Sequence, residues 1–415
     1  MKRLLLGSSA LLGAAALLGA PGLVGTARAA EPIKLSVGGF FKEAYMVVID
    51  SDDDADNPLF AQSGNEQNTD GFFNDAEVHF TGSTVLDNGL EVGARIELEG
   101  ETDGDQIDEA WVWFSGGFGE VRIGSDDDAL ANSCVVPPGG TGNFSAFSPN
   151  QWGANSTKLI SHSLDAEILG SNSVCTGVDG AGDAQKIIFI TPNFGGFQLT
   201  ASYTPSEFRE NHQFGGGPHV GMPDHSTFTE SRHNASVYAT YTYDGADWGL
   251  TAGLGGSWEG HREQGSSTAG NVAEQDFYQA GLNLRFGNFG IGAAGEYYSD
   301  MLTISFPGGL QADLDIWVAG IGASYAVDAW TFGLQYSHRH DDEDTNSFVG
   351  SFDIDVDRVV ATANYALGPG INIDGELGYT WVDFDDELED LNPGLPDNFD
   401  DYQGFEIGIG TSITF

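Results

Sequence analysis

Hydrophobic and polar residues alternate along most of the chain after residue 34. In one clear example the apolar positions are Leu90, Val92, Ala94, Ile96 and Leu98, and the residues between them are acidic, basic or glycine. Segments 371–381 and 405–415 show the same period of two. Because successive side chains of a β-strand point to opposite faces, each segment has one apolar face and one polar or glycine face. The pattern predicts an all-β chain built from many strands.

The links between these strands are of two kinds. Short links with turn residues lie at 87–89, 115–119, 193–196, 244–247, 287–288, 327–329 and 368–370. Long, acidic links lie at 50–71, 100–106, 126–184, 205–233, 259–275, 299–312, 340–351 and 384–401. Seven short and eight long links make fifteen connections, hence sixteen strands. Outer-membrane barrels have even strand numbers, short periplasmic turns and long external loops, whereas soluble sandwiches do not sort links by length. We therefore expect a 16-stranded antiparallel transmembrane β-barrel.

Aromatic residues near the strand ends agree with a membrane-spanning barrel. They form pairs 6–10 residues apart, at Trp248 and Trp258, Tyr278 and Phe286, Phe289 and Tyr297, Trp317 and Tyr325, and Trp330 and Tyr336. At about 3.3 Å per residue and a tilt near 40°, such pairs span roughly 15–25 Å, as two girdles around an apolar band would. The opposite faces consist of Gly, Ser, Thr, Asn, Glu and Arg, which we expect to line water and not to form a dry core.

The first residues have the features of an export signal. Lys2 and Arg3 precede an apolar run over 4–20, and Ala27-Arg28-Ala29 supplies a cleavage site. We expect a signal peptide at 1–29 and a mature barrel at 30–415; the alternative is a membrane anchor. Later in the chain no stretch approaches the roughly 18–20 apolar residues that a membrane helix needs.

Charge and cysteine content narrow the function further. The formal net charge of −47 makes nucleic-acid binding very unfavourable, because such a chain repels phosphate backbones. Cys134 and Cys175 fit an oxidising compartment, and no further cysteine or nearby histidine pair indicates zinc. We expect one disulfide that staples a long loop, with two free thiols as the alternative.

Several segments resemble the Gram-negative general porins, most closely those of alphaproteobacteria. Residues 74–83 and 87–99 resemble the early hairpin of these proteins, 118–124 their fifth strand, and 191–199 the turn after their sixth strand. Phe415, a final aromatic residue, is typical of outer-membrane barrels and is recognised by the barrel-assembly machinery. The resemblance covers 34–415. It implies a homotrimer in outer-membrane lipid and lipopolysaccharide, with the third external loop folded into the lumen as a constriction.

The longest link, 126–184, is the candidate constriction loop. It begins with Asp126, Asp127 and Asp128 and contains both cysteines. Alternation directs Arg95 and Arg122 inward, so basic wall residues would face an acidic loop across the eyelet. The candidate constriction residues are Arg95, Arg122, Glu97, Glu99, Asp126, Asp127 and Asp128. The alternative is an external loop of solvated charges, with the arginines paired to Glu97, Glu99 or Glu120.

The sixteen-stranded barrel and its polar inward faces lead us to expect a water-filled channel for passive diffusion of ions and small hydrophilic solutes, and the inward acids lead us to expect cation selectivity. The candidate lumen-lining residues are Glu77, Arg285, Glu296, Asp374, Glu376 and Glu406. A low-dielectric wall focuses such a negative field and concentrates cations. The alternative is that the excess acid lies in external loops and only solvates the surface.

Other functions have weaker support. No hydrolase, P-loop or H-E-x-x-H motif is present, so we do not expect an enzyme. His79 is expected to be a polar lumen residue, and six other histidines, including His340, fall in or beside long links as solvated groups. A substrate-selective channel would need an aromatic ladder, for which Trp111, Trp113, Tyr238 and Tyr298 are candidates; a non-conducting adhesin or structural barrel is the other alternative.

No cofactor is expected apart from calcium in an external loop. Asp50, Asp52, Asp54 and Asp56 alternate in one link and offer hard oxygen ligands suited to Ca²⁺. An EF-hand is excluded, because the twelfth position holds Ala61 or Ser63 where a Glu is needed. The alternative is a solvated acidic face.

Overall fold

The structure, a computed structural model, describes twelve ranges of the chain. They are 32–50, 70–100, 106–147, 172–175, 184–206, 230–263, 271–272, 274–299, 304–305, 311–345, 352–384 and 402–415. The predicted signal peptide at 1–29 and the calcium ligands Asp52, Asp54 and Asp56 lie outside these ranges, as does the side chain of Asp50. Among the described residues, no helix has the length and apolar character needed to cross a membrane.

The predicted strands are present at nearly the expected bounds. Sixteen of them make up the wall: β1 Lys34–Asp50, β2 Asp70–Val85, β3 Glu91–Glu99, β4 Ile107–Gly116, β5 Gly119–Ser125, β6 Gln185–Ile190, β7 Phe197–Ser206, β8 Glu230–Asp244, β9 Trp248–Trp258, β12 Asp276–Phe286, β13 Phe289–Ser299, β15 Gln311–Val327, β16 Trp330–Thr345, β17 Phe352–Gly368, β18 Ile371–Phe384 and β19 Tyr402–Thr414. Three short strands were not predicted: β10 His261–Glu263, β11 Asn271–Val272 and β14 Ile304–Ser305. They lie in two of the long links and extend neighbouring hairpins, as in the pairing of β10 with β8.

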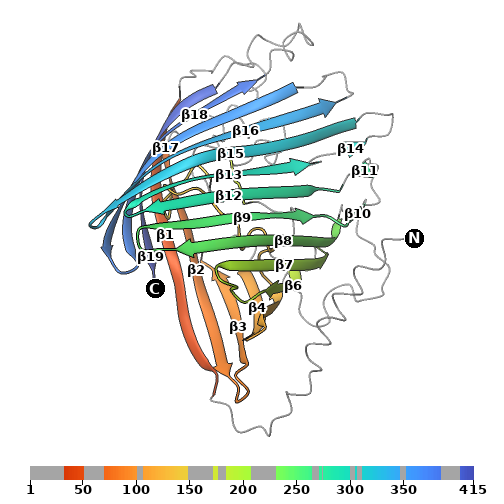
Figure 1. Ribbon diagram of the computed structural model, residues 1–415. Helices are drawn as coiled ribbons and strands as arrows, with labels where there is room; N and C mark the ends of the chain where they lie inside the picture. Colours follow the sequence, from red (N-terminus) through yellow and green to blue (C-terminus); the bar gives the residue numbers. More distant parts are fainter. Residues whose placement is uncertain are drawn as a thin grey trace.

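The wall strands close into a barrel (Figure 1). Every neighbouring pair is antiparallel, and β1 pairs with β2 on one side and β19 on the other. Thus Phe40 lies opposite both Glu77 and Thr414. The two chain ends are joined further where the Phe415 N–H donates to the Gly39 carbonyl and the Gly39 N–H donates to that of Phe415. The prediction of a closed 16-stranded barrel is confirmed.

The outer face of the barrel carries the predicted apolar band. Exposed side chains such as Leu254, Ile321 and Leu334 lie between exposed aromatic residues at the strand ends. Of the predicted girdle residues, Trp248, Tyr278, Phe286, Phe289, Tyr297, Trp317, Tyr325, Trp330 and Tyr336 are exposed, and Trp258 is half-buried. Because these side chains would be unfavourable in water, the outer face suits a lipid environment.

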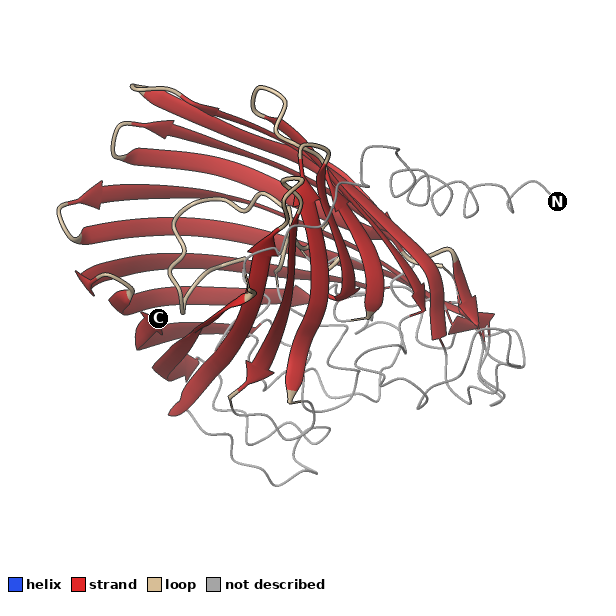
Figure 2. Ribbon diagram, turned by 90° about the horizontal axis from the view of Figure 1, so that it is seen from below, coloured by secondary structure: helices blue, strands red, loops and turns tan. Residues whose placement is uncertain are grey.

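The barrel interior is partly dry, whereas the sequence analysis expects the inward wall residues to line water. Residues 126–147 follow β5 and run across the inside of the barrel, as the tan segment in Figure 2 shows. Leu130, Val135 and Phe147 of this segment pack in a buried cluster with wall residues that include Tyr238 and Phe277. Part of the interior is therefore a dry core. The expectation was wrong here because the link supplies the apolar partners that the strands lack.

Glycines of the wall make close packing of this segment possible. A Cβ at Gly322 would collide with the Pro138 carbonyl, and one at Gly408 would collide with the Phe144 ring. Gly333, on the neighbouring strand of the wall, likewise faces the Gly139 carbonyl of the segment. We call the inward residues of β7–β19 the docking face, since residues 126–147 make most of their wall contacts there. The inward residues of β1–β5 are the charged face, although Ala44 and Met46 of β1 also pack against Phe144.

Candidate functional site: the interior of the barrel

The segment 126–147 begins with a turn that is capped by one carboxylate. Asp128 Oδ1 accepts from the backbone N–H groups of Leu130 (2.8 Å) and Ala131 (2.9 Å), and its Oδ2 accepts from the Ser257 hydroxyl of β9 at 2.7 Å. The Ala129 N–H donates to Ser236 of β8 at 2.7 Å. The contact with Ser257 fixes the start of the segment to the wall. The Asp128 side chain is buried and has little access to solvent.

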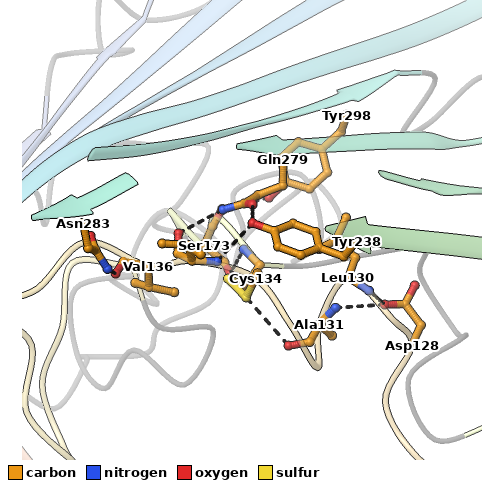
Figure 3. The surroundings of a disulfide bond; sticks show 12 residues. Asp128, Leu130, Ala131, Cys134, Val136, Ser173, Tyr238, Gln279, Asn283 and Tyr298 are labelled. Carbon is orange, nitrogen blue, oxygen red and sulfur yellow. Dashed lines mark hydrogen bonds between the residues drawn. A yellow bond between two sulfur atoms is a disulfide. The ribbon is translucent and has the colours of Figure 1, made fainter. Parts of the chain in front are cut away.

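Amide and hydroxyl side chains of the docking face bind the backbone of the segment (Figure 3). Gln279 of β12 donates to the Val135 carbonyl at 3.1 Å and accepts from the Tyr238 hydroxyl. That hydroxyl in turn accepts from the Val135 N–H at 3.2 Å. Gln335 of β16 makes the same kind of double contact: it accepts from the Ala146 N–H at 2.9 Å and donates to the Pro137 carbonyl at 3.1 Å. Gln335 thus satisfies two buried backbone groups, whereas Gln279 satisfies the Val135 carbonyl directly and the Val135 N–H through the Tyr238 hydroxyl.

The predicted disulfide is confirmed. Cys134 and Cys175 are bonded at a sequence separation of 41, and they join the segment to residues 172–175 (Figure 3). This second stretch is also held by the wall, because the Tyr298 hydroxyl donates to the Ser173 carbonyl at 2.8 Å and Asn172 donates to Ser337 at 2.9 Å. Two points of the long link are therefore fixed to the wall and to each other.

The charged face carries the candidate constriction residues of β3 and β5. Arg95 forms an ion pair with Glu97, and Arg122 forms ion pairs with Glu120 (2.7 Å) and Asp126 (3.0 Å). The guanidinium of each arginine lies over the Trp111 ring between them, at 5.3 and 5.7 Å from its centroid. The structure thus brings Arg122 to Asp126 at the acidic start of the link, whereas the ion pair of Arg95 is with Glu97 of the same strand.

A β-bulge concentrates acidic groups on the same face. β3 and β4 pair Ile96 with Ala110 but Leu98 with Ile107, so two residues of β4, Asp108 and Glu109, lie opposite the single residue Glu97. Carboxylate oxygens of Glu77, Glu99 and Asp108 lie within 4.8 Å of one another. Glu109 accepts from the Asp127 N–H at 3.0 Å, which ties the bulge to the link.

A cavity of about 410 Å³ adjoins this face, lined by Ser36, Val37, Gly38, Gly39, Phe40, Lys42, His79, Thr81, Arg95, Thr414 and Phe415. Lys42 pairs with Asp75 at 2.7 Å, and His79 Nε2 lies 2.6 Å from Glu77 Oε2. The cavity therefore has cationic and hydroxyl groups on its walls, with the acids Asp75 and Glu77 paired to lining residues, and it suits water and small polar solutes.

Four of the acids predicted to line the lumen belong to the docking face. Their side chains point inward, but they are buried. Arg358 of β17 forms ion pairs with Glu376 (3.5 Å) and Glu406 (2.8 Å), and it donates to the Ser145 carbonyl at 2.9 Å. Asp374 accepts from Asn143 at 2.6 Å and from Asn364. Glu296 of β13 is also buried. These groups therefore belong to the docking face.

The remaining candidates lie at the barrel ends. Arg285 pairs with the exposed Asp244 beside the short turn after β8. Phe415 ends the chain as an exposed side chain. Of the candidate aromatic ladder, Tyr238 and Tyr298 are buried against the link, whereas Trp111 lies on the charged face.

Sequence reasoning missed the residues that hold the link. Gln279, Gln335 and Arg358 all stand at polar positions of the alternation, so the period of two places them inside. Nothing in the local sequence distinguishes a buried amide that binds backbone from one that faces water.

The wall also contains a second buried ion pair, which joins Arg339 and Asp341 of β16 at 2.6 Å.

These features define a pore-forming class of barrel: sixteen strands, an apolar outer band, and an interior narrowed by one inserted segment. The sequence profile of the Gram-negative porins matches residues 13–386, and the chain belongs to that family. It is a pore-forming channel of the outer membrane. No individually curated protein matches the sequence.

Solved structures of other outer-membrane proteins share the fold. In-vitro folded OmpT of Vibrio cholerae, in its trimer form, has a TM-score of 0.55 at 12% identity, over 93% of this chain and 100% of that one. An anion-selective porin from Comamonas acidovorans has a TM-score of 0.52 at 17% identity, over 92% and 100%. The outer-membrane channel DcaP of Acinetobacter baumannii has a TM-score of 0.53 at 12% identity, over 95% and 100%. At such low identity the likeness concerns the fold alone.

Proposed function

We propose that the chain is a passive, cation-selective porin for ions and small hydrophilic solutes, in which the water path follows the charged face. The observation that carries the proposal is the local balance of charge. Among the described residues, acidic side chains on this face and at the start of the link outnumber the cations, which include Lys42, Arg95 and Arg122. The acids include Asp75, Glu77, Glu97, Glu99, Asp108, Glu109, Glu120 and Asp126.

This local balance matters more than the total charge of the chain. Charges in external links are screened over a Debye length of about 10 Å at 0.1 M salt, so they act weakly on an ion inside the barrel. Charges on the wall of a narrow, low-dielectric passage act on every ion that passes. The acids near Arg358 contribute less, because they are buried and paired. No chemical turnover is part of the proposed activity.

The test is a measurement of reversal potential across a planar bilayer in a tenfold KCl gradient. The proposal expects cation-selective conduction that weakens as salt is raised. A reversal potential near zero, or one that favours chloride at low salt, would contradict it. Absence of conductance from correctly folded protein would contradict the channel function itself.

We also propose a homotrimer, supported by a polar group on the outer face. Glu43 of β1 faces outward and lies opposite Thr411 of β19 and Asn74 of β2. The next outward residues of β19, Ile409 and Ile413, belong to the apolar band. A carboxylate at this level is unfavourable against lipid, whereas a second copy of the chain would cover it.

Native mass spectrometry of the detergent-solubilised protein tests this assembly. The expected result is a trimer that Glu43→Arg dissociates, because a longer side chain of opposite charge would not fit a contact formed around the carboxylate. A monomeric wild-type protein, or a trimer indifferent to Glu43→Arg, would contradict the proposed contact. The proposed roles of Phe415 in assembly, and of lipopolysaccharide as the surrounding lipid, rest on family membership.

A further inference from the structure

A cluster of histidine and aspartate side chains lies on the outer face of β16 and β17, apart from the pore. Along β16 the outward positions continue from the exposed Tyr336 to His338 and His340. The residues directly opposite on β17 are Asp357 and Asp355. Because β16 starts at a short turn and runs toward a long link, the cluster lies at the external end of the apolar band.

Hydrogen bonds determine which ring nitrogen of His338 is free. Its Nδ1 lies 2.9 Å from Asp357 Oδ1, and the same oxygen accepts from the Tyr336 hydroxyl at 2.5 Å. A carboxylate can only accept, so Nδ1 carries the proton, and the neutral ring keeps its lone pair on Nε2. Metal-binding histidines are oriented in this way, with a carboxylate on the nitrogen that does not bind the metal.

The free Nε2 of His338 faces a second carboxylate at a distance suited to a shared metal ion. It lies 3.6 Å from Asp355 Oδ1, beyond the usual range for a hydrogen bond. Two ligands of one tetrahedral ion, each about 2.1 Å from it, stand about 3.4 Å apart. His340 Nδ1 is 2.7 Å from the same oxygen, so Asp355 lies between the two imidazoles.

Trp317 of β15 limits the movement of both rings. Its ring centroid is 4.8 Å from that of His338 and 5.8 Å from that of His340. The two histidines share a strand face because they are two residues apart. The three side chains remain partly exposed, at 24%, 25% and 38% for His338, His340 and Asp355, so an ion can reach them from outside.

The interior cluster of Glu77, His79 and Glu97 is a poorer metal site even though its ligand atoms are closer together. Arg95 Nη2 lies 2.8 Å from His79 Nδ1, and a guanidinium can only donate. His79 therefore carries its proton on Nε2, where it contacts Glu77. A neutral His79 has no lone pair left for a metal, and the Arg95 charge repels cations.

We propose that His338, His340 and Asp355 bind one Zn²⁺ ion on the outer surface, with Asp357 as a positioning residue. His338 Nε2 and the Asp355 carboxylate provide two ligands nearly in place. His340 supplies the third when its ring turns about the side-chain bond, and water takes the fourth position. Imidazole and carboxylate ligands in a tetrahedral arrangement suit this ion. The bound ion would join β16 to β17 at the external rim.

The experiment measures metal binding to the folded full-length protein in detergent. Isothermal titration with ZnCl₂ gives the affinity, and Co²⁺ serves as an optical probe, because a tetrahedral ion gives an intense visible absorption. We expect one site that His338→Gln or His340→Gln weakens at least tenfold, and that Asp357→Asn weakens roughly 10–100-fold. His79→Gln is the matched control and is expected to leave binding unchanged.

Each alternative result overturns the proposal. Unchanged binding in His338→Gln would place the metal elsewhere, and loss of binding in His79→Gln would assign it to the interior cluster. Absence of any binding by the wild-type protein would remove the site. The heat-dependent shift of barrel proteins in gel electrophoresis checks that each variant is folded. Because the cluster faces outward, conductance is expected to be the same in His338→Gln, so this test and that of the pore succeed or fail separately.

Discussion

The charged face and the docking face use the same strand pattern for different purposes. On the charged face, Arg95 and Arg122 pair with neighbouring acids while they remain partly open to the interior. On the docking face, Arg358 is buried with Glu376 and Glu406 beneath the link. The difference comes from what covers the strands and not from the strands themselves. Ionic groups that water reaches can act on passing ions, whereas buried ones mainly hold the structure together.

The largest effect is expected from removal of the cation on the docking face. Arg358→Leu leaves two buried carboxylates without their partner, which should lower the free energy of unfolding by about 3–5 kcal/mol. Urea unfolding followed by tryptophan fluorescence measures this. Arg285→Leu, which breaks an exposed pair with Asp244, is the control and should cost about 0–1 kcal/mol. Equal losses would mean that burial does not separate the two regions.

The disulfide comes next in size. Replacement of Cys134 and Cys175 by serine removes a constraint across 41 residues, and should destabilise the docked link by about 2–4 kcal/mol. Faster proteolysis of the link and noisier single-channel current would report this loss. The same changes should follow addition of a reductant to the wild-type protein. A reductant without effect on the wild-type protein would indicate that the wall contacts alone hold the link.

Crowding of the docking face should move the link without altering any charge. Gly333→Ala places a methyl group against the Gly139 carbonyl, with an expected cost of about 1–3 kcal/mol and a higher single-channel conductance. Gly375→Ala is the matched control, because the nearest atom to its new methyl group is a backbone oxygen at 3.7 Å. Equal conductance in the two variants would show that the link does not narrow the pore.

The smallest energetic effect, and the most direct one for function, concerns selectivity. The triple variant Glu77→Gln, Glu99→Gln and Asp108→Asn should lower the cation-to-anion permeability ratio by roughly two- to threefold, since the charges are partly screened. The double variant Glu376→Gln and Glu406→Gln should leave the ratio nearly unchanged. Reversal potentials provide the measurement. If the double variant has the larger effect, the assignment of the two faces is inverted.

The strands could be predicted from the sequence because their signal is local. A period of two identifies each inward and outward position, and the short turns fix the register of each hairpin. The pattern thus places Glu77, Glu97 and Arg122 on the interior face without reference to their partners. The three short strands were missed because runs of two or three residues carry no recognisable period.

The resemblance to porins implies that the link enters the lumen, but the contacts that hold it could not be predicted, because they join residues that are distant in sequence. Inward glycines such as Gly322 and Gly333 were attributed to a wet lumen, although they accommodate the backbone of 138–139. Asp128 was assigned to the constriction, and the structure uses it as a cap and an anchor. His340 was placed beside a long link, yet it lies within β16 opposite Asp355. Such roles depend on which distant residues the fold brings into contact, and the sequence alone does not identify those residues.

The pairing of β1 with β19 has a consequence for how the protein is made. β19, which closes the barrel against β1, follows the other wall strands in sequence, so β1 keeps one open edge with unpaired backbone groups until β19 has been made. Contacts between residues this far apart in sequence form slowly, because the entropy of loop closure is lost before they form. Exposed strand edges also favour aggregation. The open edge of β1 therefore has to be shielded until β19 pairs with it and the backbone contacts between Phe415 and Gly39 can form.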